Sequence, residues 1–452
     1  MKNPDKLAGI EISSEKEDLI SYSFDSSITE GLLPVAVAWP KKPDDVVRLV
    51  RYADDNNFHL IPRGAGTGTT GASVPVKGQS IIVSFEKMRR LLEVDTENLT
   101  VIVEPGIINS KLQRECEYFG LFYPPDPASL EICTIGGNIA TNAGGARAVK
   151  YGVTRDYVME IEAVLPDGSV VMTGGRTHKR AVGYDLKDLF IGSEGTLGIF
   201  TKIRLRLLPL PPDILTLLVS FKSLESSGAA VSRIIAAKII PRAIELMDRS
   251  AILAVENYKP IGLPNDLEAL LIIELDGYPA TIRNEAETVI DICTSLSGDV
   301  SVAEDILSRT KIWEARRSIS PALYHIKSAK ISEDIVVPRN KISSILKELR
   351  ELSDKSGVQI VSFGHAGDGN IHVNILADKD NEEEYRKALD LVEKVFHATI
   401  SLGGSISGEH GIGYTKAPYI GMEIKKRELD LMRGIKELYD PKGTLNPGKI
   451  LL

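Results

Sequence analysis

The sequence predicts an α+β protein of two domains. The chain has 452 residues, which is too long for a single small core. Its first part contains many short β-branched segments separated by glycines and few helical patterns, and a proline-rich segment then precedes alternating strand and helix patterns. We expect a first domain over residues 1–212, a second over 213–415, and a C-terminal helical segment over 416–452.

The first domain is predicted to combine one amphipathic helix with several strands. Residues 43–57 form the helix, because Val46, Leu49 and Val50 recur at helical spacing after Pro43 and two acidic residues. Alternating or β-branched runs bounded by glycines indicate strands. These runs are residues 79–85, 99–103, 160–165, 169–173 and 198–207.

The second domain is predicted to be an antiparallel sheet backed by helices. Three prolines within residues 208–213 oppose both helix continuation and strand pairing, and they mark the boundary. Strand and helix patterns alternate after it, beginning with a strand over 215–221 and a helix over 224–237. The chain ends in helical sequence from Lys416 to the turn at Pro441.

Composition excludes several classes of protein. Lys and Arg number 54 against 62 Asp and Glu, so the net charge is −8, and no basic stretch suggests a nucleic-acid partner. The three cysteines, Cys116, Cys133 and Cys293, are too far apart for a disulfide framework, a cysteine zinc site or an iron–sulfur cluster. The sequence shows no signal peptide and no run of 18 apolar residues that could cross a membrane. We expect a cytoplasmic protein, either free or peripheral to the membrane.

A glycine-rich segment in the first domain contains Gly66-x-Gly68-x-x-Gly71, which formally matches the dinucleotide-binding fingerprint. A turn and a strand follow it, whereas the Rossmann fold requires a helix there, so the Rossmann fold is excluded. Such a loop can still bind phosphate through its backbone N–H groups, although a flexible surface turn remains the alternative. Two further glycine-rich stretches, 135–145 and 192–199, favour ligand binding.

Taken together, these segments resemble the FAD proteins of the vanillyl-alcohol oxidase type, which have a PCMH-type FAD-binding domain. The stretches that carry the resemblance are PRGAGTGTTGASVP from Pro62, PPDPAS from Pro124, GGNIATNAGGARAVKYGVTRDYV from Gly136, GSEGTLGI from Gly192 and DPKGTLNPGKIL from Asp440. The resemblance covers nearly the whole chain. It implies a two-domain flavoprotein with a substrate-binding cap domain, whose C-terminal segment returns to the FAD domain.

The resemblance also implies which residues bind FAD. The first loop is expected to line the pyrophosphate, the second stretch to pass along the diphosphate and isoalloxazine, and the third to hold the ribityl and adenine side. Some relatives bind the flavin covalently through a histidine of the first loop. Thr67 occupies that neighbourhood here, so dissociable FAD is expected. The implied cofactor residues are Arg63, Gly64, Ala65, Gly66, Thr67, Gly68, Thr69, Pro125, Gly136, Gly137, Asn138, Thr141, Asn142, Gly144, Glu194, Thr196, Gly198, Ile199 and Asn446.

Four of the seven histidines lie within residues 365–410. Strand alternation places His372 and Asn374 on one face, and a turn allows His365 to fold back beside His372. Two neutral imidazoles could bind a divalent metal or could form ordinary hydrogen bonds. We expect His397 to be a packed or half-exposed helix residue.

A carboxylate from SISGEHGIG would complete the metal site. Glu409 together with His365 and His372 gives a His₂Glu ligand set with open positions, which is typical of catalytic zinc, and His410 then remains unligated. Zinc is the first choice from the ligand types, although manganese or iron(II) would bind the same set.

The segments GHAGDGNIHVN and GEHGIG look like signatures of the metal-dependent D-2-hydroxyacid dehydrogenase branch, which includes D-lactate and D-2-hydroxyglutarate dehydrogenases and the flavin subunit of glycolate oxidase. The resemblance implies His365, His372 and Glu409 as metal ligands and His410 as the catalytic base. The substrate contacts that it implies are Arg316, Ser320, Lys330 and Asn374. From the residues alone, Arg316 could equally lie on a solvated helix face and Lys330 on a strand edge.

The expected function is FAD-dependent oxidation of a D-2-hydroxy acid, such as D-lactate or glycolate, to the 2-keto acid. The C2 hydrogen passes as hydride to flavin N5 with assistance from the metal. Without a cysteine cluster, the electrons must pass to an external acceptor such as a flavoprotein, an iron–sulfur subunit, a quinone or oxygen. A homodimer is left open. The alternatives are a zinc-dependent hydrolase and a non-catalytic FAD scaffold subunit of a larger oxidase complex.

Overall fold

A computed structural model describes Leu7 and residues 9–260, 262, 264 and 266–451. The chain divides into two compact units. Unit 1 comprises Met1–Gly144, Val153–Leu210 and Glu409–Leu452, and unit 2 comprises Gly145–Gly152 and Pro211–Gly408. Helices and strands are mixed in both units, as the α+β prediction requires.

Unit 1 contains a mostly parallel four-stranded sheet with the order β1-β2-β4-β3. Its strands are β1 (Glu11–Ser13), β2 (Ala36–Trp39), β4 (Ser80–Ser84) and β3 (His59–Arg63). Helix α2 (Pro43–Asn56) packs its predicted apolar face, including Val46, Leu49 and Val50, into the core of this sheet. The next regular element after β3 is strand β4, so no helix follows the first glycine-rich loop and the exclusion of the Rossmann fold is confirmed.

The second sheet of unit 1 is antiparallel, with the order β5-β6-β10-β8-β9. Its strands are β5 (Leu91–Asp95), β6 (Thr100–Val103), β10 (Ile199–Arg206), β8 (Val158–Val164) and β9 (Val170–Gly174). The five predicted strands of the first domain are therefore confirmed. One detail of the proline-rich segment was wrong: β11 (Leu208–Pro209) pairs with β7 (Leu121–Phe122), because a proline at a sheet edge keeps its carbonyl acceptor.

The remaining elements of unit 1 are mostly short helices. The C-terminal tail lies beside β3, where the Leu60 N–H donates to the Thr444 carbonyl and the Asn446 N–H donates to the Leu60 carbonyl. The C-terminal segment thus returns to unit 1.

Besides α2, the described helices of unit 1 are α1 (Lys16–Ser21), α3 (Asn109–Tyr118), α4 (Ile135–Thr141), η2 (Thr154–Tyr157), α6 (Leu186–Phe190), η4 (Ala417–Tyr419), α13 (Ile420–Glu423) and α14 (Lys426–Tyr439).

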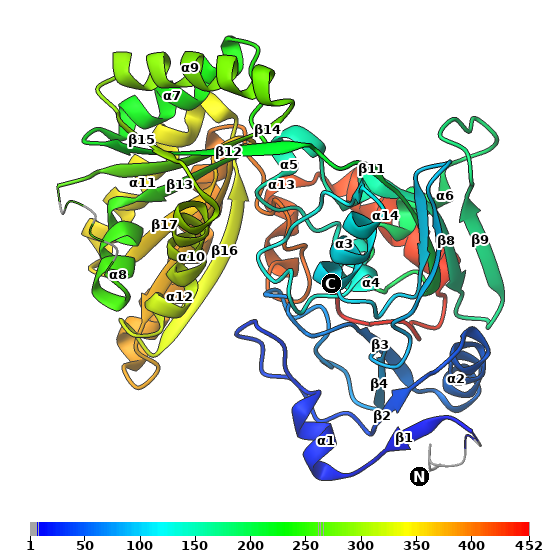
Figure 1. The fold of residues 1–452 in the computed structure, drawn as a ribbon. Helices are drawn as coiled ribbons and strands as arrows, with labels where there is room; N and C mark the ends of the chain where they lie inside the picture. Colours follow the sequence, from blue (N-terminus) through cyan, green and yellow to red (C-terminus); the bar gives the residue numbers. More distant parts are fainter. Residues whose placement is uncertain (1–6, 8, 261, 263, 265, 452) are drawn as a thin grey trace. The chain divides into compact units, whose positions relative to one another are not determined.

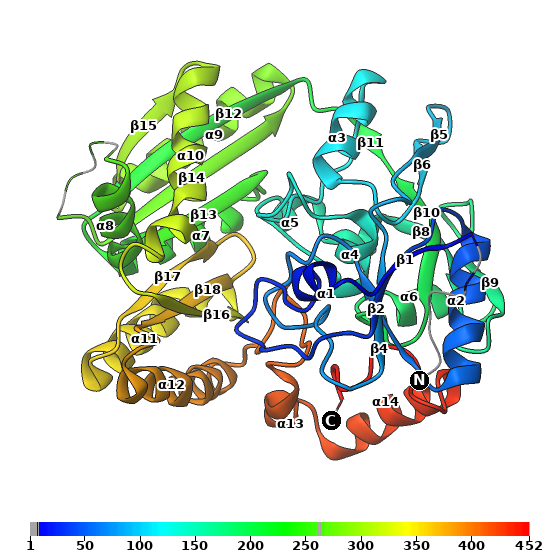
Figure 2. The same ribbon diagram turned by 90° about the horizontal axis from the view of Figure 1, so that it is seen from below.

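Unit 2 is built on one antiparallel sheet of seven strands in the order β15-β12-β14-β13-β17-β18-β16 (Figures 1 and 2). The strands in that order are β15 (Asp299–Ala303), β12 (Asp213–Phe221), β14 (Ala269–Gly277), β13 (Ala243–Asp248), β17 (Ile360–His365), β18 (Asn370–Ala377) and β16 (Ala329–Val336). The predicted antiparallel sheet backed by helices is confirmed.

Helices cover both faces of this sheet. On one face α7 (Leu224–Ala236) contacts α9 (Pro279–Ser295) and α11 (Ile342–Ser356), and α11 contacts α12 (Glu382–Ser401). On the other face α8 (Arg249–Tyr258) and α10 (Ile306–Leu323) share a core with Met247, Val361 and Phe363 of the strands. The short elements α5 (Ala148–Tyr151) and η3 (Arg339–Lys341) complete unit 2. None of the described helices is long and apolar enough to cross a membrane.

Candidate functional site

A row of ionisable side chains crosses the face of the seven-stranded sheet that α10 covers. Strand register pairs Glu245 of β13 with His365 of β17, Phe363 of β17 with His372 of β18, and His372 with Asp334 of β16. Residues paired in register project to the same face of a sheet. Four strands therefore present Glu245, His365, His372 and Asp334 side by side, all of them buried.

The two histidines approach each other through their Nε2 atoms, which lie 3.4 Å apart. Two nitrogens bound to one ion at about 2.0–2.1 Å in tetrahedral geometry are separated by about 3.4 Å. The turn between the strands requires glycine at Gly369, which has a φ of +92° and whose Cβ would lie 2.0 Å from the Val337 carbonyl oxygen. The predicted fold-back of His365 beside His372 is confirmed, and the donor atoms fit a divalent metal.

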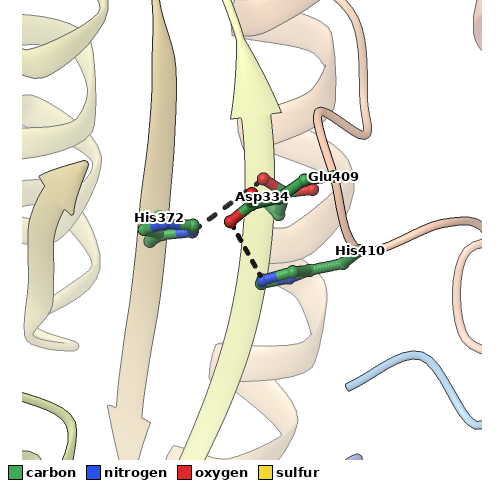
Figure 3. Close-up of side chains that lie close together, drawn as sticks. All are labelled: Asp334, His372, Glu409 and His410. Carbon is green, nitrogen blue, oxygen red and sulfur yellow. Dashed lines mark ion pairs between the residues drawn. The ribbon is translucent and has the colours of Figure 1, made fainter. Parts of the chain in front are cut away.

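Glu409 and His410 follow a residue that is hydrogen-bonded to this row of side chains. The Gly408 N–H donates to Asp334 Oδ2 at 2.9 Å, and Glu409 and His410 are the next two residues. One ligand atom from each of Asp334, His372, Glu409 and His410 lies within 4.8 Å of the others (Figure 3). This group contains two of the three predicted metal ligands, and the third, His365, adjoins it through His372.

Asp334 was not singled out from the sequence. Its fully buried carboxylate accepts hydrogen bonds from the Asn370 amide at 2.5 Å and from the Ser407 hydroxyl at 3.3 Å, in addition to the Gly408 N–H. The His372 Nδ1 atom lies 3.9 Å from Asp334 Oδ1. Asp334 thus holds the start of the loop formed by residues 408–413, the histidine loop, and it also contributes a carboxylate to the group in Figure 3.

Within unit 1, Glu194 holds the backbone that follows His410. Its carboxylate accepts hydrogen bonds from the Ile412 N–H and the Gly413 N–H, each at 2.8 Å. Burial raises the pKa of Glu194 to about 7, although these two N–H groups oppose the shift. The Thr70 hydroxyl donates to the His410 carbonyl at 3.3 Å. The structure therefore gives Glu194, implied as a cofactor residue, direct contacts with the histidine loop.

Arg316 is a buried residue of α10 itself, so a solvated position for it is excluded. Its Nε and one terminal nitrogen donate to Glu245 Oε2 at 2.8 and 2.7 Å, and the guanidinium carbon lies 4.5 Å from the centre of the Phe363 ring. The second carboxylate oxygen, Oε1, lies 2.5 Å from His365 Nδ1. Burial acts to raise the pKa of Glu245, but His365 and Arg316 hold it below its usual value. Sequence reasoning missed Glu245.

Lys330 of β16 is brought against Ser320 of α10. Its ammonium donates to the Ser320 hydroxyl at 2.6 Å and lies 5.0 Å from the centre of the Tyr324 ring. Burial lowers the pKa of Lys330 to about 8. Within the described part of the chain no carboxylate pairs with this ammonium, and a desolvated cation without a paired carboxylate is the arrangement expected of an anion-binding group.

Two other predicted residues also have definite positions. The buried Asn374 amide accepts a hydrogen bond from the Ser332 hydroxyl at 3.0 Å and donates to the Val361 carbonyl at 3.4 Å. His397 lies on α12, 3.7 Å from Glu393, so its helix position is confirmed; its side chain is 69% exposed, which is more than the packed or half-exposed position that was expected.

The glycine-rich segments of unit 1 pack closely against one another. The Arg63 guanidinium donates to the Phe24 carbonyl at 2.7 Å, and a Cβ on Gly66 would lie 2.1 Å from that guanidinium. A Cβ on Gly64 would lie 2.2 Å from the Thr134 hydroxyl, which caps helix α4. Glycine at these two positions is therefore required by the close approach of the loop to Arg63 and α4.

Each of the three segments contributes a buried polar atom without a hydrogen-bond partner among the described residues. These atoms are Thr69 Oγ1, Asn138 Nδ2 and Ser193 Oγ. Buried polar atoms in native proteins are nearly always hydrogen-bonded, so a polar ligand is expected to satisfy them. The residues present therefore fit FAD.

Other implied cofactor residues use polar atoms to hold the backbone. The Asn446 amide donates to the carbonyls of Ala72 and Glu194, at 2.8 and 2.6 Å. The Asn142 side chain accepts from the Arg155 N–H at 2.9 Å, and the Pro125 carbonyl accepts from the Gln113 amide at 2.8 Å. Roles for these residues at the cofactor stay predictions.

The comparisons with known proteins match both parts of the chain. The FAD binding domain family matches residues 34–174, and the family described as FAD linked oxidases, C-terminal domain, matches residues 210–450. The chain is 42% identical over 432 residues to glycolate oxidase subunit GlcD of Bacillus subtilis, covering 95% of this chain and 91% of the relative. It is 36% identical to D-lactate dehydrogenase of Anaerostipes hadrus, covering 90% of this chain and 87% of the relative.

Solved structures share the fold. p-Cresol methylhydroxylase superposes with a TM-score of 0.82 at 16% identity, covering 97% of this chain and 93% of that structure. The comparisons support FAD-linked oxidation and give no support to the zinc hydrolase alternative. The matches over both domains show that the chain belongs to the family of FAD-linked oxidases.

Proposed function

We propose that the protein oxidises a D-2-hydroxy acid, such as glycolate or D-lactate, to the corresponding 2-keto acid. The observation that carries the proposal is the α10 face of the unit 2 sheet, where the buried Arg316 of α10 and the half-buried Lys330 of β16 lie on the same face as two imidazoles suited to a metal. The FAD-binding domain and the names of the relatives support this choice of reaction.

The substrate carboxylate is assigned to Lys330 and Arg316. Lys330, with Ser320 beside it, supplies a partly desolvated ammonium that an anionic carboxylate would stabilise. Arg316 already gives its Nε edge to Glu245, so it can offer the substrate only the end edge, with one N–H from each terminal nitrogen. The two groups fix the acid by its carboxylate end and so orient C2.

The hydroxyl end is assigned to the histidine row. His365, His372 and Glu409 would hold a divalent metal, for which zinc is the first choice and manganese and iron(II) are alternatives. A metal held there would supply Lewis-acid polarisation of the hydroxyl, and bound FAD would supply the acceptor for the hydride that leaves C2. His410 accepts the hydroxyl proton, so that one hydride and one proton leave the acid in balance.

FAD is proposed to be dissociable, because Thr67 stands where covalent relatives have histidine and the described segment 63–71 contains no histidine. The electrons are proposed to pass to an external flavoprotein, iron–sulfur subunit or quinone. Two relatives are named as subunits of glycolate oxidase, which supports an acceptor outside this chain. The cytoplasm remains the proposed compartment.

Anaerobic titration of the FAD-loaded protein with D- and L-2-hydroxy acids tests the proposal. One or more D acids, or glycolate, should bleach the flavin absorbance in a single turnover, and matched L acids should be much slower. Each bleached flavin should yield one equivalent of 2-keto acid. If none of the acids reduces the flavin in protein with a full complement of metal, the oxidation is contradicted and the scaffold alternative returns.

A further inference from the structure

We propose that Glu245 is a positioning residue that couples the metal site to the substrate-carboxylate site. The inference rests on the function proposed above and adds a residue that the motifs do not contain. Glu245 lies in β13, some 70 to 120 residues along the chain from the two groups that it holds, Arg316 and His365.

The carboxylate of Glu245 divides its two oxygens between two partners. Oε2 receives both N–H groups from one edge of Arg316, at 2.8 and 2.7 Å, and Oε1 lies 2.5 Å from His365 Nδ1. The side chain is 1% exposed, so water does not compete for either oxygen. Charge-assisted hydrogen bonds of this kind have defined geometry as well as strength.

The contact with His365 determines which nitrogen can bind a metal. A carboxylate at Nδ1 favours the tautomer with hydrogen on Nδ1, which leaves the lone pair on Nε2. That Nε2 atom faces the Nε2 atom of His372 at 3.4 Å. Glu245 thereby presents His365 as a ligand in the orientation that the pair requires.

The contact with Arg316 restricts how the guanidinium can meet a substrate. Glu245 occupies the Nε edge, and the Phe363 ring lies against the guanidinium with 4.5 Å between carbon and ring centre. Arg316 therefore keeps one orientation, and the edge formed by its two terminal nitrogens is left to donate to a substrate. A shift of Glu245 would disturb both the ligand and the carboxylate contact.

The variant Glu245→Gln tests the coupling, with Glu274→Gln as the matched control. Glu274 is a buried carboxylate on the neighbouring strand β14 and on the same face, bound to Arg242 at 2.9 Å and to Trp313 at 2.9 Å. Its hydrogen-bond and ion-pair partners among the described residues are Thr216, Trp313 and Arg242, so the variant removes a buried charge and leaves His365 and Arg316 with their own partner. Both variants should be loaded with FAD and checked for melting temperature.

The first measurement is the dissociation constant for Zn²⁺, obtained by chelator competition and metal analysis without turnover. Glu245→Gln should bind Zn²⁺ roughly 10- to 100-fold more weakly, the usual effect of losing the group behind a ligating histidine. The Glu274→Gln control should stay near the unmodified protein. Glu245→Asp keeps the charge and should retain more Zn²⁺ than Glu245→Gln.

The second measurement is KM for the hydroxy acid in single and double variants. Glu245→Gln alone should raise KM relative to the unmodified protein. Added to Arg316→Gln, it should change KM little further, but the double variant should still bind Zn²⁺ more weakly than Arg316→Gln alone. Equal zinc affinity in Glu245→Gln and the control, or in Glu245→Gln and Glu245→Asp, overturns the inference. Failure of the unmodified protein to bind Zn²⁺ or to reduce flavin contradicts the proposed function instead, so the two failures are distinguishable.

Discussion

At the scale of single residues, some residues of the site could be predicted from the sequence and others could not. Alternation along the strand placed His372 and Asn374 on one face, and the turn placed His365 beside His372. Glu245 and Asp334 could not be found in this way, because a lone carboxylate in a strand acquires a partner only through register. Their partners become visible once β13 is paired with β17 and β16 with β18.

Lys330 should make substrate capture depend on pH. Burial lowers its pKa to about 8, and only the ammonium form attracts a carboxylate. The kcat/KM value reports ionisations of the free enzyme, so it should fall as the pH rises through about 8. Lys330→Met should lower kcat/KM roughly 30-fold or more at pH 7, since truncating one partner of a buried charge pair costs about 2–5 kcal/mol, and should remove this limb of the profile.

A nearby surface lysine provides the control for that experiment. Lys327 is paired with Asp378 at 2.7 Å and with Glu384, outside the substrate contacts. Lys327→Met should keep the unmodified pH profile. A profile for Lys330→Met that still falls near pH 8 would show that another group titrates there.

At the scale of elements, local pattern predicted some of the helices and strands, but it missed strands such as β1, β2, β3 and β5 and did not show how loops are held. Helix α2 and strands β4, β6, β8, β9 and β10 were found at the expected places, because their apolar periodicity is set by burial on one face. The support of the histidine loop was not predictable. It comes from Glu194, more than 200 residues earlier in the chain, whose carboxylate binds two consecutive backbone N–H groups of that loop.

Glu194→Gln should therefore weaken the histidine loop. A glutamine amide can accept from only one of the two N–H groups of Ile412 and Gly413, and its own NH₂ would face the other donor. An unsatisfied buried donor costs about 1–3 kcal/mol, which should appear in urea unfolding and as faster hydrogen exchange at these two amides. Glu97→Gln at an exposed turn should change the free energy of unfolding by less than about 0.5 kcal/mol. Unchanged exchange at Ile412 and Gly413 would contradict the bracing role.

At the scale of the whole molecule, the two units divide the chemistry between them. Unit 1 contains the glycine-rich segments with their unpartnered polar atoms and also Glu409 and His410, and unit 2 contains Arg316, Lys330, His365 and His372. The sequence indicated this division through its motifs, but it did not show that residues 145–152 belong to unit 2. Tyr151 donates to Asp276 of β14 at 2.6 Å, a contact that nothing within the motif itself indicates.

The division predicts that metal and flavin can be removed separately. The histidine ligands lie in β17 and β18, whereas the polar atoms suited to FAD lie in the glycine-rich segments of unit 1. Treatment with a chelator followed by ultrafiltration should abolish bleaching of the flavin by the hydroxy acid, while the flavin absorbance stays with the protein. Chelator already saturated with Mg²⁺ is the control, and adding back Zn²⁺, Mn²⁺ or Fe²⁺ separately identifies the ion that restores bleaching. Full bleaching in protein shown by metal analysis to be metal-free would refute the metal requirement, and loss of FAD together with the metal would show that the two sites depend on each other.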